Sequence, residues 1–129
     1  MGRLVLVVDN EQDVLNVLSE ILGSMGCEVY KASNGIKALE IMANTKFDLI
    51  IADLIMPEMG GLDFLKQIKE KKKHAPIVIT AGIDPQTAMI DFNEYGISEF
   101  IKKPFTIDDV NRKLQKYLQK EPGSIGASV

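Results

Sequence analysis

Residues 49–57 read LIIADLIMP, in which four apolar residues are followed by an aspartate, Asp53. A short, nearly continuous apolar run of this kind is typical of a parallel strand that is covered on both faces. Two further segments have the same character, LVLVV (4–8) and IVIT (77–80). Two others mix polar with apolar residues, as edge strands do, EVYKA (28–32) and EFIK (99–102). The sequence therefore predicts three central strands and two edge strands in one sheet.

The predicted strands alternate with longer segments that have helical periodicity. We expect the strands at Leu4–Val8, Glu28–Ala32, Asp48–Ala52, Pro76–Thr80 and Glu99–Lys102. A five-fold βα alternation predicts an α/β fold, with right-handed crossovers and helices on both faces of a five-stranded parallel sheet. With the first, third and fourth strands central, the simplest doubly wound, flavodoxin-like arrangement has the strand order 2-1-3-4-5.

Capping patterns predict where two of the helices begin. Asp84 followed by Pro85 has the pattern of an N-cap with proline at the first helical position, and Thr106–Asp109 resembles a capping box. The apolar stripe of the last helix is expected to face the core and comprises Ile107, Val110, Leu114 and Leu118.

The composition fits one globular domain. The 129 residues are 46% hydrophobic, and 15 basic against 18 acidic side chains give a net charge of −3, which argues against a broad nucleic-acid or membrane-binding surface. The single cysteine, Cys27, excludes an intramolecular disulfide, and no apolar stretch approaches the ~18 residues that suggest a membrane span. We therefore expect a soluble, cytoplasmic domain at residues 1–120 and a flexible tail or linker stub at residues 121–129.

Polar side chains follow the predicted strands at one edge of the sheet, where open parallel sheets bind their ligands. They are Asp9, Asn10 and Glu11 after the first strand, Asp53 after the third, Thr80 at the fourth and Lys103 after the fifth. Clustered carboxylates keep their charges readily around a cation, and oxygen ligands suit Mg²⁺. Together with an ammonium and a hydroxyl they make a site for a phosphoryl group, with Asp53 the best candidate for the nucleophile.

Four segments together resemble the response regulator receiver domains of two-component signalling, a CheY-like family. They are LVLVVDNE, DLIIADLIMPEMGG, PIVITAG and FIKKPF, and the resemblance covers roughly residues 3–119. It implies that Asp53 accepts a phosphoryl group from a histidine kinase or phosphotransfer protein. It also implies output to a partner protein or effector domain through the face of the fourth helix, fifth strand and fifth helix, and no enzyme activity beyond the domain's own phosphorylation and dephosphorylation.

The resemblance also implies roles for single residues. The implied ligands of Mg²⁺ are Asp9, Asn10, Asp53 and the backbone carbonyl of Ile55. Thr80 matches the hydroxyl that contacts the phosphoryl oxygen, and Lys103 matches the lysine that pairs with it. Phe100 matches the aromatic switch position, which is expected to turn inward when Thr80 moves toward the phosphoryl group. The loop matches are Pro57 and Gly60 after the phosphoacceptor, and Pro104, whose preceding peptide bond is typically cis in the family.

Asn10 departs from the family pattern, which usually has a second acidic residue there. An amide oxygen coordinates without formal charge, so we expect weaker Mg²⁺ binding, and Glu11 is a candidate to compensate. One alternative is a degenerate receiver that binds a partner without being phosphorylated. Another is an aspartyl phosphatase of the haloacid dehalogenase type, although Ile55 stands where that chemistry places a second aspartate. The sequence leaves open the cognate kinase, homodimer formation, and whether the chain acts alone or within a larger regulator.

Overall fold

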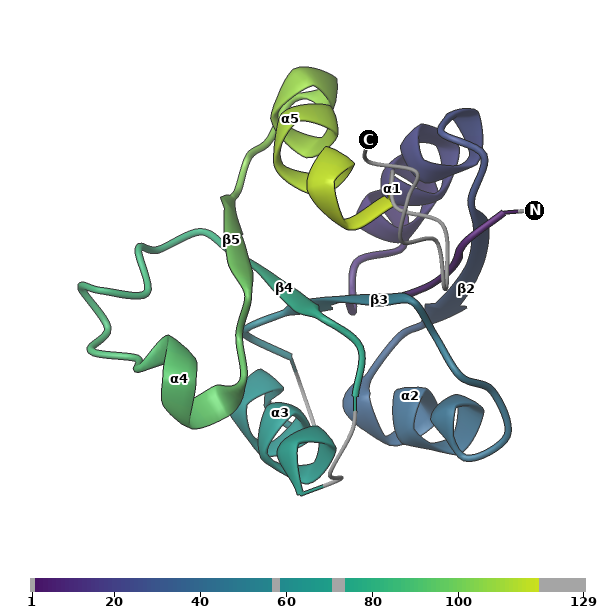
Figure 1. Ribbon diagram of the computed structural model, residues 1–129. Coiled ribbons are helices and arrows are strands. Elements are labelled where there is room, and N and C mark those ends of the chain that lie inside the picture. Colours follow the sequence, from purple (N-terminus) through teal and green to yellow (C-terminus); the bar gives the residue numbers. More distant parts are fainter. Residues whose placement is uncertain (1, 57–58, 71–73, 119–129) are drawn as a thin grey trace, which may run out of the picture.

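The computed structural model describes residues 2–56, 59–70 and 74–118. In these ranges five parallel strands form one sheet in the order β2-β1-β3-β4-β5, a flavodoxin-like α/β fold (Figure 1). The strands are β1 (Leu4–Val8), β2 (Glu28–Ala32), β3 (Leu49–Asp53), β4 (Ile77–Ala81) and β5 (Glu99–Lys102). The helices are α1 (Gln12–Ser24), α2 (Gly35–Met42), α3 (Gly61–Lys69), α4 (Phe92–Tyr95) and α5 (Ile107–Leu118). The predicted strand order and edge strands are confirmed, whereas Pro57 and the expected tail at residues 121–129 lie outside the described residues.

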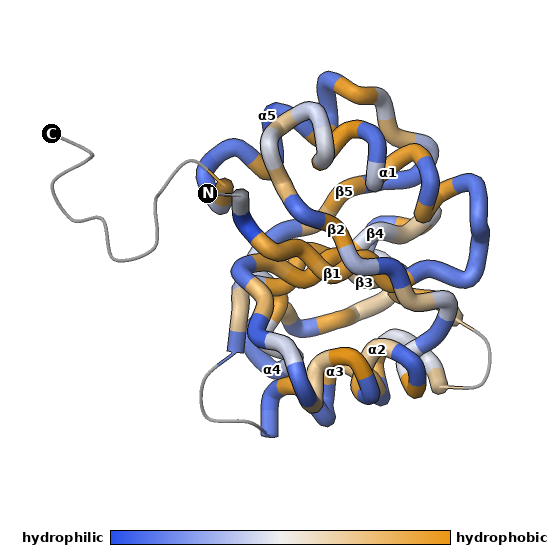
Figure 2. The backbone as a smooth tube through the Cα atoms, turned by 90° about the vertical axis from the view of Figure 1, so that its right-hand side faces the viewer, coloured by the Kyte–Doolittle hydropathy of each residue, from blue (hydrophilic) through white to orange (hydrophobic). Residues whose placement is uncertain are grey.

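The sheet separates two layers of helices. Figures 1 and 2 show α1 and α5 on one face and α2, α3 and α4 on the other, with the most hydrophobic strands between them. Because side chains alternate along a strand, each central strand contributes to both cores. In β1, Val5 and Val7 pack in the core beneath α1 and α5, whereas Leu6 and Val8 pack in the opposite core with Phe64 of α3. The sheet is thereby covered on both faces, as its apolar strands predict.

Two strands are displaced by one residue from the prediction. β3 and β4 each begin and end one position later than expected. Asp48 lies just outside β3, where its carboxylate accepts a hydrogen bond from the backbone N–H of Leu4 at 2.8 Å. Asp53 is instead the last residue of β3 and is the register partner of Thr80 in β4. The pairing of β3 with β4 therefore places a carboxylate and a hydroxyl at adjacent positions in the ladder.

The fourth helix is shorter than the sequence predicts. Asp84 and Pro85 begin only a turn, and α4 starts at Phe92, with Asp91 as its N-cap. The turn ends at Met89, whose φ of 60° places it in the left-handed region. The N–H groups of Met89 and Ile90 donate to the carbonyls of Gln86 and Pro85, each at 3.0 Å, in the pattern that closes a helix C-terminus. Asp84 and Pro85 therefore begin a turn and not a helix, so the helix start predicted at this position was wrong.

The start of α5 agrees with its capping box, although not with the full apolar stripe. The Asp109 N–H donates to the Thr106 hydroxyl at 3.0 Å, and the Thr106 N–H donates to the Asp109 carboxylate at 2.9 Å. Val110 and Leu114 are fully buried, but Ile107 is 63% exposed because it lies in the first turn of the helix, beyond the end of β5. None of the helices within residues 2–56, 59–70 and 74–118 is long and apolar enough to cross a membrane.

Candidate functional site

The carboxyl edge of the sheet gathers acidic side chains around one ammonium group. Lys103 Nζ lies 2.8 Å from Asp9 Oδ2, 3.3 Å from Asp53 Oδ2 and 3.5 Å from Glu11 Oε1. Asp9 and Asp53 are buried, at 1% and 6% exposure, and Thr80 beside Asp53 is also buried. Side chains predicted to share a site from separate segments of the chain do meet at this edge.

Backbone hydrogen bonds position the two buried carboxylates. Asp9 follows β1, and its N–H donates to the Ala32 carbonyl at 3.1 Å, while its Oδ1 accepts from the Glu11 N–H at 2.9 Å. Asp53 Oδ1 accepts from the Ile55 N–H at 3.2 Å. In each case one carboxylate oxygen accepts a hydrogen bond from the backbone N–H of the residue two positions later. The other oxygen faces Lys103.

Lys103 reaches this position from the end of β5. Its backbone N–H donates to the Ala81 carbonyl at 2.7 Å. The Lys103–Pro104 peptide bond is cis, as the resemblance implied. Lys103 is far from Asp9 in the sequence, and the pairing of β5 with β4 brings its side chain to Asp9.

The electrostatics of the site follow from this crowding. Burial raises the pKa of the Asp53 carboxyl above its ordinary value, and the charge of Asp9 adds to the rise, while Lys103 and the Ile55 N–H oppose it. Burial lowers the pKa of Lys103, but the Asp9 hydrogen bond and the charges of Asp53 and Asp9 outweigh it, so that this pKa lies above its ordinary value. Lys103 is therefore a cation, and positive charge near Asp53 favours its ionised form.

The donor set fits a hard divalent cation. Asp9 and Asp53 present carboxylate oxygens at one edge, and the exposed Asn10 between Asp9 and Glu11 adds an amide oxygen. Within the described ranges no three or more His, Cys, Asp or Glu side chains are arranged so that they could hold a metal ion. The two buried carboxylates each form an ion pair with Lys103. Oxygen ligands with room for water suit Mg²⁺, so the residues present are compatible with the expected ion.

Phe100 lies on β5, next to the site rather than in it. It is half-buried and packs against the core on the side of α2, α3 and α4, and its register partner in β4 is Ile79. Its carbonyl accepts a hydrogen bond from Lys113 Nζ at 2.9 Å. The register partner of Thr80 is Ile101, the residue after Phe100, so Phe100 does not lie directly opposite Thr80 in the ladder. The switch role of Phe100 stays a prediction.

A groove that the sequence did not reveal adjoins the site. It has a volume of about 410 Å³ and runs beside Lys103 between the start of α1 and the loop after β5. Its apolar walls are Val14, Val17, Pro104 and Phe105. Val17 is 44% exposed, whereas the buried residues of α1 are Leu15, Leu18, Ile21 and Leu22. An apolar residue outside the buried face of α1 was a signal that the sequence offered.

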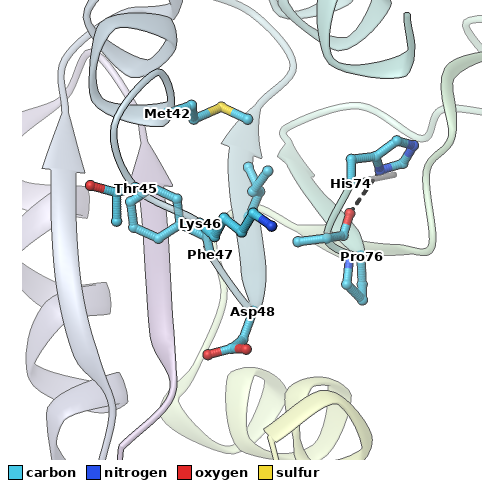
Figure 3. Close-up of a pocket in the computed structure, with 9 residues that line it drawn as sticks. Met42, Thr45, Lys46, Phe47, Asp48, His74 and Pro76 are labelled. Atoms are coloured by element: carbon cyan, nitrogen blue, oxygen red, sulfur yellow. Dashed lines mark hydrogen bonds between the residues drawn. The ribbon is translucent and has the colours of Figure 1, made fainter. Parts of the chain in front are cut away.

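A second cavity lies at the opposite edge of the sheet. It measures about 500 Å³, and Figure 3 shows Met42, Lys46 and Phe47 on one side and His74 and Pro76 on the other. Two of its polar side chains interact with the backbone: Asp48 accepts from the Leu4 N–H, and His74 Nδ1 lies 2.9 Å from the Ala75 carbonyl. This cavity is separated by the length of the strands from Asp53 and takes no part in the candidate site.

Comparison with known proteins agrees with this geometry. The response regulator receiver domain family matches residues 5–115. The chain is 34% identical over 117 residues to the chemotaxis protein CheY of Thermotoga maritima, which covers 90% of this chain and 98% of that protein. It is similar to the structure of the chemotaxis response regulator CheY4 of Vibrio cholerae, with 29% identity, a TM-score of 0.84, and coverage of 92% and 100%.

A third similar protein was solved with ligands. The response regulator TrrA of Thermotoga maritima, in complex with Mg²⁺ and BeF, is 32% identical, with a TM-score of 0.79 and coverage of 90% of this chain and 99% of that one. The family match spans most of the chain, and these likenesses extend over nearly all of it. The chain therefore belongs to the response regulator receiver domains of two-component signalling.

Proposed function

We propose that Asp53 takes a phosphoryl group from a histidine side chain of a histidine kinase or phosphotransfer protein. An oxygen of the Asp53 carboxylate attacks phosphorus, the bond between phosphorus and the donor's ring nitrogen breaks, and the imidazole leaves with the electron pair. The observation that carries the proposal is that Lys103 Nζ lies within 3.3 Å of a carboxylate oxygen of both Asp9 and Asp53, at the edge of the sheet where Thr80 is the register partner of Asp53.

A divalent cation would be held at the same edge. The proposed ligands are Asp9, Asn10, Asp53 and the backbone carbonyl of Ile55. Mg²⁺ bound there supplies positive charge that offsets the repulsion between the phosphoryl oxygens and the carboxylates. Lys103 would pair with the transferred group, and the Thr80 hydroxyl would donate to one of its oxygens.

The signal would pass from Asp53 along β4 and β5. A phosphoryl group adds about two negative charges and new demand for hydrogen-bond donors. Thr80 would move toward it, and Phe100 would turn into the volume that Thr80 leaves, which shifts the balance between two packings of α4, β5 and α5. This face would then bind an output protein, an effector domain or a second copy of the chain.

Acyl phosphate labelling tests the central claim. Incubation of the whole chain with acetyl phosphate and MgCl₂ should add the mass of one phosphoryl group, and Asp53→Asn should abolish the addition. Asp84→Asn is the matched control, because Asp84 also follows a central strand but its carboxylate accepts the N–H of Gln86, at 2.9 Å, and makes no ion pair with Lys103 in the described part of the chain. An unlabelled wild type, or a label that persists in Asp53→Asn, would contradict the proposal.

One competing function rests on a specific observation. Asn10 removes an acidic ligand, so a degenerate receiver that binds its partner without phosphorylation is the second candidate. Partner binding that Asp53→Asn and acetyl phosphate both leave unchanged would favour it. Receiver domains are signalling modules and not conventional enzymes, which sets aside the phosphatase alternative. We also propose a cytoplasmic location, since the chain's only cysteine, Cys27, is unpaired.

A further inference from the structure

Lys103 contacts one carboxylate more than the two buried aspartates. Its ion pairs in the described part of the chain join it to Asp9, Asp53 and Glu11. Three carboxylates and one ammonium carry a net charge of −2, and without Glu11 this charge is −1. Asn10 is neutral, so the site reaches the larger negative charge only through Glu11.

The backbone around Glu11 explains how its side chain reaches Lys103. Glu11 is the N-cap residue of α1, its N–H donates to Asp9 Oδ1 at 2.9 Å, and its carbonyl accepts from the Leu15 N–H at 3.1 Å. Its carboxylate makes no capping hydrogen bond to the helix. The main chain is thus fixed by Asp9 and by α1, while the side chain is available to the site.

The Glu11 carboxylate, although it pairs with Lys103, is accessible to an incoming cation. Its side chain is 62% exposed, whereas those of Asp9 and Asp53 are buried. A carboxylate at the mouth of the site attracts a divalent ion directly or through a bound water. Gln12, the next residue, cannot supply this charge, and its amide donates to Asn16 at 3.0 Å.

We propose that Glu11 supplies the acidic charge that Asn10 lacks and so maintains the affinity of the site for Mg²⁺. The inference deepens the proposed function and rests on it. Glu11 is a positioning residue in this scheme, because it acts on the cation and on Lys103 and not on the phosphoryl group.

Isothermal titration calorimetry with MgCl₂ on the whole chain tests the inference. Glu11→Gln should weaken binding by about three- to tenfold at low ionic strength, as expected for the loss of one nearby charge. Asp13→Asn is the matched control, because Asp13 is an exposed acid of the first turn of α1 that lines the same groove but makes no ion pair with Lys103 in the described part of the chain. It should change the affinity by less than about twofold.

A charge swap separates this role from a structural one. Asn10→Asp combined with Glu11→Gln keeps the charge of the site and should restore the affinity that Glu11→Gln loses. Equal affinities for Glu11→Gln and Asp13→Asn, or a swap that fails to recover binding, would overturn the inference. Labelling of the same variants by acetyl phosphate at saturating MgCl₂ reports on Asp53 independently, so failure of the proposed function is distinguishable from failure of the role of Glu11.

Discussion

The ionisation of Asp53 depends on the groups that surround its carboxyl. Burial and the charge of Asp9 raise the pKa of its carboxyl, and Lys103 opposes the rise. The start of α3 approaches the backbone of Asp53 and Leu54 so closely that Gly61 has no room for a side chain. A Cβ atom at Gly61 would overlap the Leu54 carbonyl oxygen and would lie 2.6 Å from that of Asp53. The absence of a single methyl group at Gly61 therefore sets how closely α3 approaches the end of β3, which carries Asp53.

Gly61→Ala should consequently disturb both the fold and the site. The added methyl group must push α3 away from the backbone of Asp53 and Leu54, at a cost of about 1–3 kcal/mol in the free energy of unfolding. Urea denaturation gives this cost, and acetyl phosphate labelling should become slower. Gly60→Ala is the control, because a Cβ there meets no atom within 4 Å and the φ of −64° suits alanine. Equal stabilities for the two variants would refute this account of the loop.

At the scale of elements, β5 and α5 form the unit that carries both Lys103 and Phe100. Glu99 of β5 pairs with Lys113 at 3.3 Å and with Lys116 at 3.2 Å, both on α5. Lys113 also donates to the Phe100 carbonyl. Burial raises the pKa of Glu99, but hydrogen bonds from Lys116 and Lys113 outweigh it and hold the pKa below its ordinary value. The ionised form of Glu99 therefore stabilises the contact of this helix with the edge strand.

The pH dependence of this contact has a definite sign. Because the pKa of Glu99 is lower in the folded chain, its contribution to stability is complete above the ordinary value of 4.5 and disappears as pH falls through the folded pKa. Glu99→Gln should lower the free energy of unfolding by under about 1 kcal/mol at neutral pH. The difference from wild type should vanish in acid. Thermal unfolding over a pH series measures it, with Glu40→Gln on the exposed side of α2 as control, and a gap that persists in acid would disprove the assignment.

At the scale of the whole molecule, the carboxyl edge of the sheet is the edge that combines charged groups with an apolar groove. The carboxyl edge holds the acidic site and, next to Lys103, the groove between α1 and the loop after β5. Under the proposed function, a protein phosphodonor would bring its histidine to Asp53 from outside this edge. The apolar wall at Val17 and Phe105 would offer such a protein a surface next to Lys103, which acetyl phosphate would not require.

Val17→Glu should therefore separate the two kinds of donor. Transfer from a cognate phosphodonor protein should slow by about tenfold or more, since a buried charge in an apolar contact is costly. Labelling by acetyl phosphate should stay unchanged. Ile36→Glu is the control, because Ile36 on α2 is equally exposed, at 45% against 44%, and lies on the opposite face of the sheet. Equal slowing in both variants, or slower labelling by acetyl phosphate in Val17→Glu, would contradict this use of the groove.

The amino-acid sequence alone determined the strand order and the members of the acidic site. Apolar runs and their polar ends are local patterns, and parallel strands bring their carboxyl ends to one edge whatever the details of packing. Asp9, Asp53, Thr80 and Lys103 could therefore be placed together before any coordinates were known.

Only the tertiary structure decided how these groups pair and where two helices depart from their patterns. The contact of Lys103 with Glu11 depends on strand and loop positions that are distant in the chain. Met89 adopts a left-handed φ that helix propensity does not encode, and Ile107 stays exposed because α5 begins beyond the end of β5. Such features are set by long-range contacts and by the geometry of neighbouring elements, whereas sequence patterns report the local preferences of the chain.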